Sequence, residues 1–433
     1  MKRKIKVTKI SSADRACGIA TYDAGDRAET EKYEEKIEWV KVAAVDDEPG
    51  IQHDPKRTLT TIAQDDLDSW HKEAKLIAKK SDIVVLEYEH GIDHPTQQGY
   101  VTISEEVKKR GKRLIFNTHT LEFEPPEDRR QATTKLFELS DMAFALNRIA
   151  TDAILRKKVY GNVPREKIVP MPHYVRNGLD TSEENQNRLS EMYGIKDRKT
   201  SVSVGLMSKG KGIDLLIDGL GMAWNNRKIL PEKNKWEMLH LCLGSAHPNT
   251  KKEMGGDEEW RNYIFQTYGK KLDQHSMPWL YCPGLKELTE TDLSHYVFVF
   301  VDHFLAENEF RHALVLPKIA FVTNQSSQQI SSGPVSEFGT IRPLITTHSL
   351  ASEQQLLPIF RRRGNLINAE ERDSGWLAEM GKRYSADLAE AYGEAVTNDE
   401  LRHWMGIQAV SKRPEQTLEY LTQRKIEHYR QVL

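Results

Sequence analysis

The chain has 433 residues, of which 38% are hydrophobic and 29% charged, and its formal net charge is −2. This length is too great for one ordinary core and favours two domains, and the composition is that of a globular protein. The near-neutral charge excludes a global attraction to nucleic acid or to an anionic membrane surface. No apolar run approaches the roughly 20 residues that a membrane span needs.

Short apolar segments alternate with longer amphipathic ones along the first part of the chain. Strands are expected at 4–10, 37–45, 82–92, 113–120, 142–147 and 167–175. Helices are expected from near Gly18 and at 65–80, 101–111, 129–140 and 149–160. The polar stretch 176–199 shows no strand pattern and is interpreted as an interdomain linker.

The same rhythm restarts after the linker. Strands are expected at 200–207, 236–245, 277–284, 312–323, 342–348 and 364–368. Helices are expected at 212–224, 258–268 and 290–296, and 373–433 is mostly helical by pattern. The segment 297–311 fits neither pattern and is interpreted as an insertion.

This βαβα rhythm predicts an α/β fold with two Rossmann-like domains, each built on a doubly wound parallel sheet. We expect the domains at 1–180 and 199–400, and a helical segment at 401–433 that packs back on the N-terminal domain. Ligands of such sheets bind at the carboxyl ends of the strands.

The stretch "VGLMSKGKGIDLLIDGL" (204–220) runs from a strand through a glycine-containing loop into a helix. Free backbone N–H groups and a helix dipole make such a turn a natural anion site, and Lys209 or Lys211 would add a full charge. The glycine spacing matches neither the Walker loop nor the dinucleotide fingerprint. An ordinary turn with solvated lysines is the alternative.

A second strand-to-helix turn lies in "SSQQISSGPVSEFGTIRPLITTH" (326–348). Ser332 and Gly333 precede a short predicted helix that carries Glu337, whose carboxylate can accept hydrogen bonds from a ribose diol. A serine-capped turn with a solvated glutamate is the alternative.

Polar side chains follow several strands of the first domain, in "CGIATY" (17–22), "YEHGI" (88–92), "NTHT" (117–120) and "PHYV" (172–175). We expect the candidates His90, Asn117, His119 and His173 to converge at one edge of the sheet. No metal is expected, because His90 and His94 lack the helix and the glutamate of a zinc-protease motif. The three cysteines have neither metal-site nor disulfide spacing, which favours a reducing, cytoplasmic setting.

Taken in order, "CGIATY", "YEHGI", "NTHT", "PHYV", "GLMSKGKGIDLLIDGL", "LGSAHP" and "SSGPVSEFGTIRPLITT" resemble the retaining GT-B glycosyltransferases of family 4, in their bacterial branch. The resemblance covers about 4–357 and implies a GT-B fold whose two domains face a central cleft. It implies a sugar nucleotide, UDP- or GDP-linked, as donor, a hydroxyl compound as acceptor, and no prosthetic group.

The resemblance also assigns roles to residues. Lys211, in the K-G-I-D loop, would pair with the donor diphosphate, which Gly18, Ser332 and Gly333 would approach through their backbones. His119 would lie near the transferred sugar. Glu337 matches the second glutamate of the Glu-x7-Glu motif and would hold the ribose.

Two positions depart from the family pattern. Gln329 stands where the first glutamate of Glu-x7-Glu is expected, so that an amide would meet the sugar. Leu206 stands where an arginine often precedes the lysine loop, and Lys209 is the substitute that we expect. These departures put the identity of the donor sugar in question.

Two other functions stay open. A non-catalytic GT-B relative would bind a nucleotide sugar or a glycan, and Gln329 and Leu206 favour it. A phage-type glucosyltransferase would act on DNA bases, and the basic runs 108–113 and 361–364 could contact phosphates. Solvated helix ends and loops are the alternative explanation for such runs.

Overall fold

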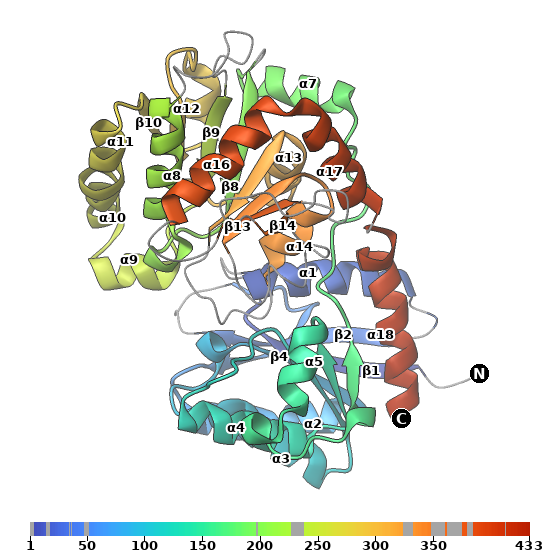
Figure 1. Ribbon diagram of the computed structural model, residues 1–433. Helices are drawn as coiled ribbons and strands as arrows, with labels where there is room; N and C mark the ends of the chain where they lie inside the picture. Colours follow the sequence, from blue (N-terminus) through green and yellow to red (C-terminus); the bar gives the residue numbers. More distant parts are fainter. Residues whose placement is uncertain are drawn as a thin grey trace. The chain divides into compact units, whose positions relative to one another are not determined.

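The strands form two parallel sheets, one in each of two compact units (Figure 1). The computed structural model of the protein describes residues 4–13, 18–33, 35, 37–46, 52–195, 198–226, 238–323, 332–347, 360–361, 375–378, 384–411 and 413–433. The described residues of the first unit lie within Met1–Tyr174 and Glu415–Leu433. Those of the second lie within Val175–Ser327 and Ser332–Pro414.

The first unit has the strand order β3-β2-β1-β4-β5-β6-β7, with every neighbouring pair parallel. The strands are β1 (Ile5–Ser11), β2 (Ile37–Asp46), β3 (Thr58–Ala63), β4 (Ile83–Tyr88), β5 (Arg113–Thr118), β6 (Met142–Ala145) and β7 (Ile168–Pro170). The order reverses between β1 and β4, which is the point where doubly wound sheets bind ligands.

Seven α-helices are described in this unit: α1 (Gly18–Thr30), α2 (Leu67–Lys80), α3 (Gly99–Lys109), α4 (Glu127–Leu139), α5 (Arg148–Leu155), α6 (Lys157–Tyr160) and α18 (Leu418–Val432). Short 3-10 turns are η1 (Glu31–Tyr33), η2 (His90–Ile92) and η3 (Arg165–Lys167). Helix α18 buries Leu421, Ile426 and Tyr429 in the apolar cluster that also holds Val7 and Val85 of the central strands. The end of the chain therefore belongs to the core of the first unit.

The second unit has the order β10-β11-β9-β8-β12-β13-β15-β14, again with parallel neighbours. The strands are β8 (Lys199–Val204), β9 (Met238–Leu243), β10 (Trp279–Cys282), β11 (Phe298–Val301), β12 (Ile319–Val322), β13 (Leu344–Thr347), β14 (Phe360–Arg361) and β15 (Gly375–Ala378). The order reverses between β8 and β12.

The helices of this unit cover both faces of its sheet. They are α7 (Glu183–Met192), α8 (Ile213–Asn226), α9 (Pro248–Met254), α10 (Asp257–Tyr263), the π-helix η7 (Ile264–Gly269), α11 (Lys270–Gln274), α12 (Leu285–Glu290), α13 (Glu307–Val315), α14 (Gly333–Gly339), α16 (Tyr384–Thr397) and α17 (Asp399–Ser411). A 3-10 turn, η4 (Lys209–Lys211), precedes α8, and another, η9 (Arg413–Gln416), lies where the chain returns to the first unit.

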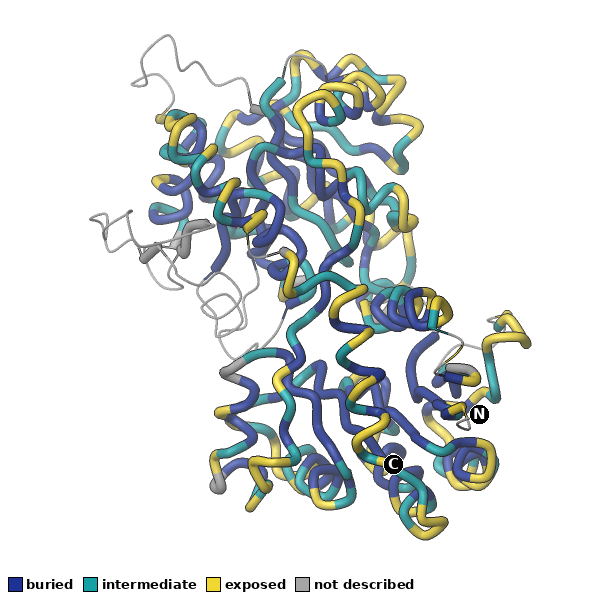
Figure 2. The backbone as a smooth tube through the Cα atoms, turned by 90° about the vertical axis from the view of Figure 1, so that its right-hand side faces the viewer, coloured by how far each residue is buried: buried dark blue, intermediate teal, exposed yellow. Residues whose placement is uncertain are grey.

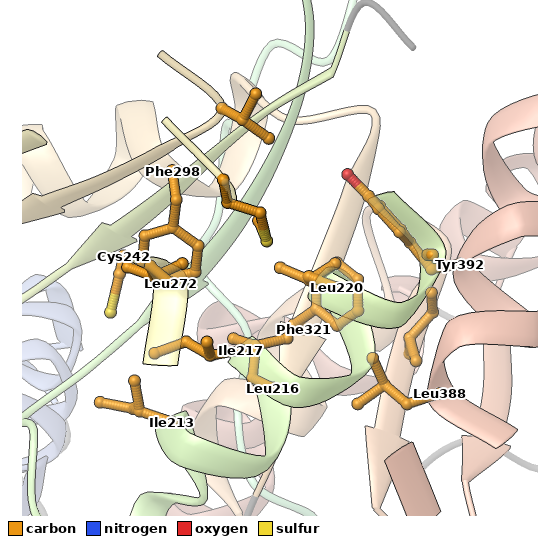
Figure 3. Close-up of a cluster of buried hydrophobic side chains, with 14 of the residues drawn as sticks. Ile213, Leu216, Ile217, Leu220, Cys242, Leu272, Phe298, Phe321, Leu388 and Tyr392 are labelled. Carbon is orange, nitrogen blue, oxygen red and sulfur yellow. The ribbon is translucent and has the colours of Figure 1, made fainter. Parts of the chain in front are cut away.

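The period of two along β11 shows how one strand serves two cores. Phe298 and Phe300 point to the face covered by α8 and α16, where Leu216, Leu220 and Leu388 also lie, whereas the residues that alternate with them enter the core on the other face (Figure 3). The central strands of both sheets are buried, whereas the edge strand β3 and the outer helices carry exposed residues (Figure 2).

Several elements differ from the sequence expectations. The segment 297–311 is not an insertion: it holds β11 and the start of α13, whose first turn is acidic as helix N-termini favour. The predicted helix 290–296 is wrong, because the helix runs at Leu285–Glu290 and the following residues form a turn.

Two further elements were not expected. Strand β3 lies in the polar stretch before α2, and helix α7 lies in the predicted linker, where the Ser182 side chain caps it by accepting from the Asn185 N–H. The predicted strand 364–368 lies outside the described residues. Among the described helices, none has the combined length and apolar character that crossing a bilayer requires.

Candidate functional site

The loop between β8 and α8, residues 205–212, is called the donor loop below. Its 3-10 turn closes with a hydrogen bond from the Lys211 N–H to the Ser208 carbonyl at 3.0 Å. Gly212 then adopts the left-handed conformation, with φ of 64°, which favours glycine, and α8 begins at the next residue. The Thr323 hydroxyl donates to the Lys211 carbonyl at 2.9 Å and so ties the loop to the end of β12.

A second loop, after β9, holds the donor loop from the other side. The Met207 N–H donates to the Ser245 carbonyl at 2.8 Å, and the His247 N–H donates back to Met207 at 2.8 Å. Gly244 makes this approach possible, because a Cβ there would lie 2.0 Å from the Gly205 carbonyl oxygen. The backbone of the donor loop is therefore fixed by neighbours on both sides.

These loops surround a pocket of about 410 Å³, open solvent at its mouth included. The pocket lies at the carboxyl ends of β8, β9 and β12, where the sheet order reverses. Lys211, Thr323 and Pro334 line it together with the backbone of Gly205 and its neighbours. The structure thus brings Lys211 together with the first turn of α14, which holds Gly333.

Glu337 lies on α14 and is 2% exposed. The Ser332 hydroxyl caps this helix by accepting from the Val335 N–H at 3.5 Å. Arg176 donates to Glu337 with its backbone N–H at 3.2 Å and with a guanidinium N–H, and it also makes a two-bond ion pair with Glu307. Burial raises the pKa of Glu337, and Arg176 opposes that rise.

Arg176 was not singled out from the sequence, where it falls in the predicted linker. The carboxylate expected to hold a ribose is therefore already bound by a buried guanidinium. Lys209 contributes its backbone to the 3-10 turn of the donor loop. The Lys209 side chain and all of Gln329 lie outside what the structure describes.

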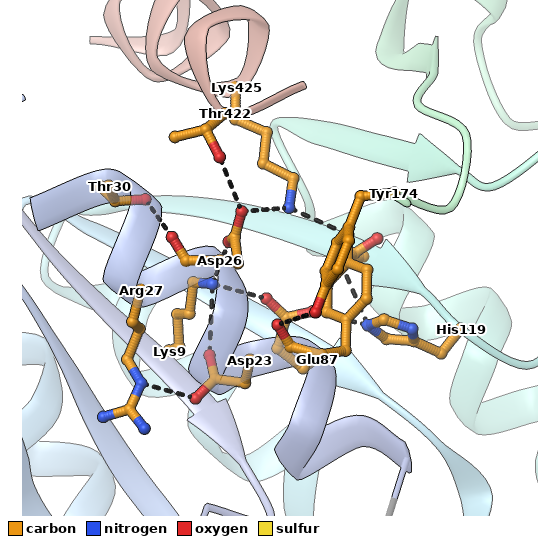
Figure 4. Close-up of polar contacts among 12 residues, drawn as sticks. Lys9, Asp23, Asp26, Arg27, Thr30, Glu87, His119, Tyr174, Thr422 and Lys425 are labelled. Carbon is orange, nitrogen blue, oxygen red and sulfur yellow. Dashed lines mark hydrogen bonds and ion pairs between the residues drawn. The ribbon is translucent and has the colours of Figure 1, made fainter. Parts of the chain in front are cut away.

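In the first unit, Asn117 and His119 come from the end of β5, and both contact one carboxylate. Glu87 Oε2 lies 2.6 Å from Asn117 Nδ2 and 2.7 Å from His119 Nε2 (Figure 4). The Tyr22 ring stands edge-on to His119 at 4.6 Å and to His173 at 5.0 Å. The expected convergence thus holds for three residues, with Tyr22 and Glu87 as the partners that join them.

His90 has other neighbours. Its Nδ1 lies 2.9 Å from the Tyr88 hydroxyl, and its Nε2 lies 3.8 Å from Glu122 Oε2. Burial, with Arg129 as a second cause, lowers the pKa of His90 to about 4. Gly18 is the first residue of α1 and is exposed, with no atom near the position of a Cβ.

Glu87 belongs to a buried group of charges that the sequence analysis did not find. This ion cluster consists of Lys9, Asp23, Asp26, Arg27, Glu87 and Lys425. One signal was present: Lys9 shares the alternating face of its strand with Ile5 and Val7, and Lys425 falls on the apolar face of α18. Within the described residues, no three His, Cys, Asp or Glu side chains are grouped so as to hold a metal ion.

The basic run 108–113 is partly paired with nearby carboxylates. Lys108 and Arg113 both pair with Asp141, at 2.8 and 3.2 Å, and Arg110 pairs with Glu106 at 2.6 Å. Lys112 lies 3.9 Å from Asp82, so the five cations of the run share three carboxylates and keep a surplus of positive charge. The second basic run, 361–364, falls outside the residues whose side chains are described.

Solved structures with the same fold cover nearly the whole chain. HepE of Anabaena, solved with UDP-glucose, is 13% identical with a TM-score of 0.67 over 99% of this chain and 100% of that one. The GT-B fold is shown. Sucrose-phosphate synthase of Thermosynechococcus elongatus is 13% identical, with a TM-score of 0.69 over 99% of each chain.

A third similar structure is the UDP-forming α,α-trehalose-phosphate synthase of Burkholderia xenovorans, 11% identical with a TM-score of 0.62 over 99% of each chain. No protein-family model matches the chain, and no curated protein matches its sequence. The prediction of two Rossmann-like domains of GT-B type is confirmed at the level of the fold.

Proposed function

We propose that the protein is a glycosyltransferase that moves a sugar from a nucleotide-diphosphate donor to an acceptor hydroxyl. The observation that carries the proposal is the donor loop: it places Lys211 in a pocket at the point where the strand order of the second sheet reverses. The solved structures that share the fold include proteins bound to UDP-glucose or named as UDP-forming. UDP is therefore the first nucleotide to test, with GDP as the second.

In this proposal Lys211 stabilises the leaving diphosphate. A cation and fixed backbone N–H groups stabilise developing negative charge best when they are already in place before the reaction. The hydrogen bond from Thr323 holds the Lys211 carbonyl, and the β9 loop holds Met207 earlier in the same loop. The backbones of Ser332 and Gly333 and the charge of Lys209 would add to it, and no metal is then needed for this step.

Glu337 is proposed to hold the ribose, with Arg176 opposing protonation of its carboxylate and orienting it. The ion pair leaves lone pairs on both carboxylate oxygens, since each can accept more than one hydrogen bond. Gln329 is proposed to contact the sugar through its amide.

For the first unit, the proposal keeps the roles that the resemblance implies. His119 lies near the transferred sugar, His90, Asn117 and His173 serve the acceptor, and the Gly18 backbone serves phosphate. We further propose retention of the anomeric configuration, membership of family 4 and a cytoplasmic setting. The sequence motifs and the cysteine spacing support these points.

One observation favours a second candidate, a non-catalytic relative that binds a nucleotide sugar or a glycan. Arg176 occupies the carboxylate of Glu337, and Gln329 and Leu206 replace the charged residues of the family pattern. The DNA-base alternative gains no specific support from the structure, because carboxylates pair with part of the run 108–113.

Calorimetric titration with UDP-glucose, UDP and GDP-mannose tests the proposal on the full chain. We expect one nucleotide to bind wild type, and Lys211→Met to weaken it about 10- to 100-fold, as the loss of one charged hydrogen bond of roughly 1.5–3 kcal/mol implies. Lys270→Met is the matched control, because Lys270 is exposed on α11 and outside the pocket. Equal affinity for wild type and Lys211→Met would refute the assignment of the donor loop.

A further inference from the structure

Glu87 and Asn117 are register partners on the paired strands β4 and β5. His119 follows Asn117 by two residues, so the two side chains leave the same face of the sheet. Both reach Glu87 Oε2, His119 through Nε2 at 2.7 Å and Asn117 through Nδ2 at 2.6 Å. The Glu87 side chain is buried, with 1% of the residue exposed. One of its carboxylate oxygens therefore contacts two candidate site residues at once.

The other oxygen of Glu87 leads into the ion cluster. Lys9 Nζ lies 3.4 Å from Glu87 Oε1 and 3.2 Å from Asp23 Oδ1, and it also pairs with Asp26. Lys425 of α18 is the last member of this series of contacts. Its Nζ lies 2.9 Å from Asp26 Oδ1 and 3.0 Å from the Tyr22 hydroxyl (Figure 4).

The cluster balances three cations against three carboxylates. Lys9 and Lys425 are fully enclosed, yet a buried charge persists only when it is paired. Burial acts to raise the pKa of Glu87, but Lys9, the hydrogen bond from His119 and Lys425 outweigh it and lower that pKa to about 2. Glu87 is thus an anion at neutral pH.

A carboxylate can only accept hydrogen bonds, so its contact with His119 requires the proton to lie on Nε2. Asn117 Nδ2 is 3.3 Å from the same nitrogen, but it already donates to Glu87 at a shorter distance. The partner of one ring nitrogen fixes the tautomer and the orientation of the ring.

We propose that Glu87 is a positioning residue for His119, fixing its Nε2–H tautomer and ring orientation, and that Lys425 of the last helix helps to hold this carboxylate in place through Asp26 and Lys9. The catalytic consequence rests on the glycosyltransferase function proposed above, whereas the tautomer does not. The last helix is then part of the machinery that orients a residue about 300 positions earlier in the chain.

The tautomer is tested without any substrate, by nitrogen NMR of the full-length protein labelled in histidine, with His119→Gln identifying the signal. In wild type we expect the proton on Nε2. In Glu87→Gln we expect the two tautomers to mix, because an amide oxygen accepts more weakly and its NH2 group can donate to the ring instead.

Asp23→Asn is the matched control. It removes the same charge from the ion cluster and also contacts Lys9, but it does not touch His119. We expect its His119 signal to match wild type. Glu87→Asp guards against misfolding, since it keeps the charge and shortens the reach, and we expect it to mix the tautomers as well. A His119 signal that is unchanged in both Glu87 variants would overturn the proposal.

Turnover of the nucleotide sugar gives the second readout. We expect Glu87→Gln to lower kcat about 10- to 100-fold with a much smaller change in KM for the donor, as a misplaced site residue does. Asp23→Asn should lower kcat less than about threefold. Equal losses in the two variants would mean that Glu87 acts only through stability. If wild type shows no turnover, the glycosyltransferase proposal fails while the NMR result still decides the tautomer.

Discussion

The first strands of the two sheets occupy the same place in the same fold and are filled with opposite chemistry. In the first unit β1 brings Lys9 into a buried cluster of charges. In the second unit β8 brings Ser201 and Ser203, whose hydroxyls lie 3.0 and 3.1 Å from the two ring nitrogens of the buried His240.

The difference teaches how each unit builds its candidate site. The first unit orients side chains, and it uses paired charges to hold them. In the second unit the partners of β8 at His240 are neutral hydroxyls, and the donor loop is shaped by glycines and backbone hydrogen bonds so that Lys211 and the loop backbone line the pocket. Substitutions in the two units should therefore act in different ways, through lost charge pairing in the first and through displaced backbone in the second.

Lys9→Met should destabilise the first unit and leave the second unit folded. Removing one partner of a buried charge cluster leaves its carboxylates uncompensated and costs about 3–5 kcal/mol. Hydrogen exchange read by mass spectrometry should show lost protection in β1, β4 and α18 alone. Lys32→Met is the control, because Lys32 pairs with Glu29 at 2.7 Å but its side chain is 65% exposed, so the loss should stay under about 1 kcal/mol. Equal protection in both variants would contradict a structural role for the cluster.

Gly244→Ala should damage the second unit through its backbone. The added Cβ would lie 2.0 Å from the Gly205 carbonyl, and φ at Gly244 is 144°, so the two loops must separate. We expect a loss of about 1–3 kcal/mol of unfolding free energy, as for other overpacked sites, together with weaker nucleotide binding. Gly393→Ala should instead stabilise the protein by about 0.5–1 kcal/mol, since it is helical and has open space around it. Unchanged nucleotide affinity in Gly244→Ala would show that the β9 loop does not support nucleotide binding at the donor loop.

His240 should make the second unit sensitive to mild acid. Burial lowers the pKa of His240 to about 3 in the folded state, so below pH 6.5 the unfolded chain binds a proton that the folded chain does not. Wild type should therefore lose roughly 1–2 kcal/mol relative to His240→Gln between pH 6.5 and pH 5, since the slope rises to 1.36 kcal/mol per pH unit only below the unfolded pKa. Denaturant unfolding of both proteins across this range measures it. If the unfolding free energies of the two proteins changed with pH in parallel, the His240 ring would already be protonated or solvated in the folded state.

Thr323→Val should change stability and nucleotide affinity less than the substitutions above. It removes the hydrogen bond to the Lys211 carbonyl, which is worth about 1 kcal/mol, and should lower nucleotide affinity a few-fold. Thr346→Val is matched to it, because that buried hydroxyl donates to the Val322 carbonyl at 2.8 Å and does not touch the donor loop. The two variants should lose similar stability, and only Thr323→Val should lose affinity.

The order of strands and helices was predictable because apolar periodicity is local. The strand-to-helix turn at 205–212 was predictable for the same reason, since "MSKGKGID" carries its glycines and lysines within eight residues. The segment 297–311 was misassigned because its strand is only four residues long, and residues 302–306, which mix polar and apolar side chains without regular structure, separate it from α13. Short strands carry too little pattern to be told from loops.

The partners of the site residues could not be predicted, because they come from distant parts of the chain. Lys425 reaches Asp26 across 399 positions and Arg176 reaches Glu337 across 161. A lysine on an apolar face marks the position as unusual, as at Lys9, but only the packed structure says which carboxylates meet it.

Turnover of UDP-glucose by the full chain, followed as release of UDP in the presence and absence of candidate sugar acceptors, tests the central claim most directly. We expect wild type to release UDP, an acceptor to raise the rate, and Lys211→Met to lose the activity while Lys270→Met keeps it. Binding of UDP-glucose without any release of UDP, under every acceptor tried, would contradict the enzyme and leave a nucleotide-sugar-binding protein in its place.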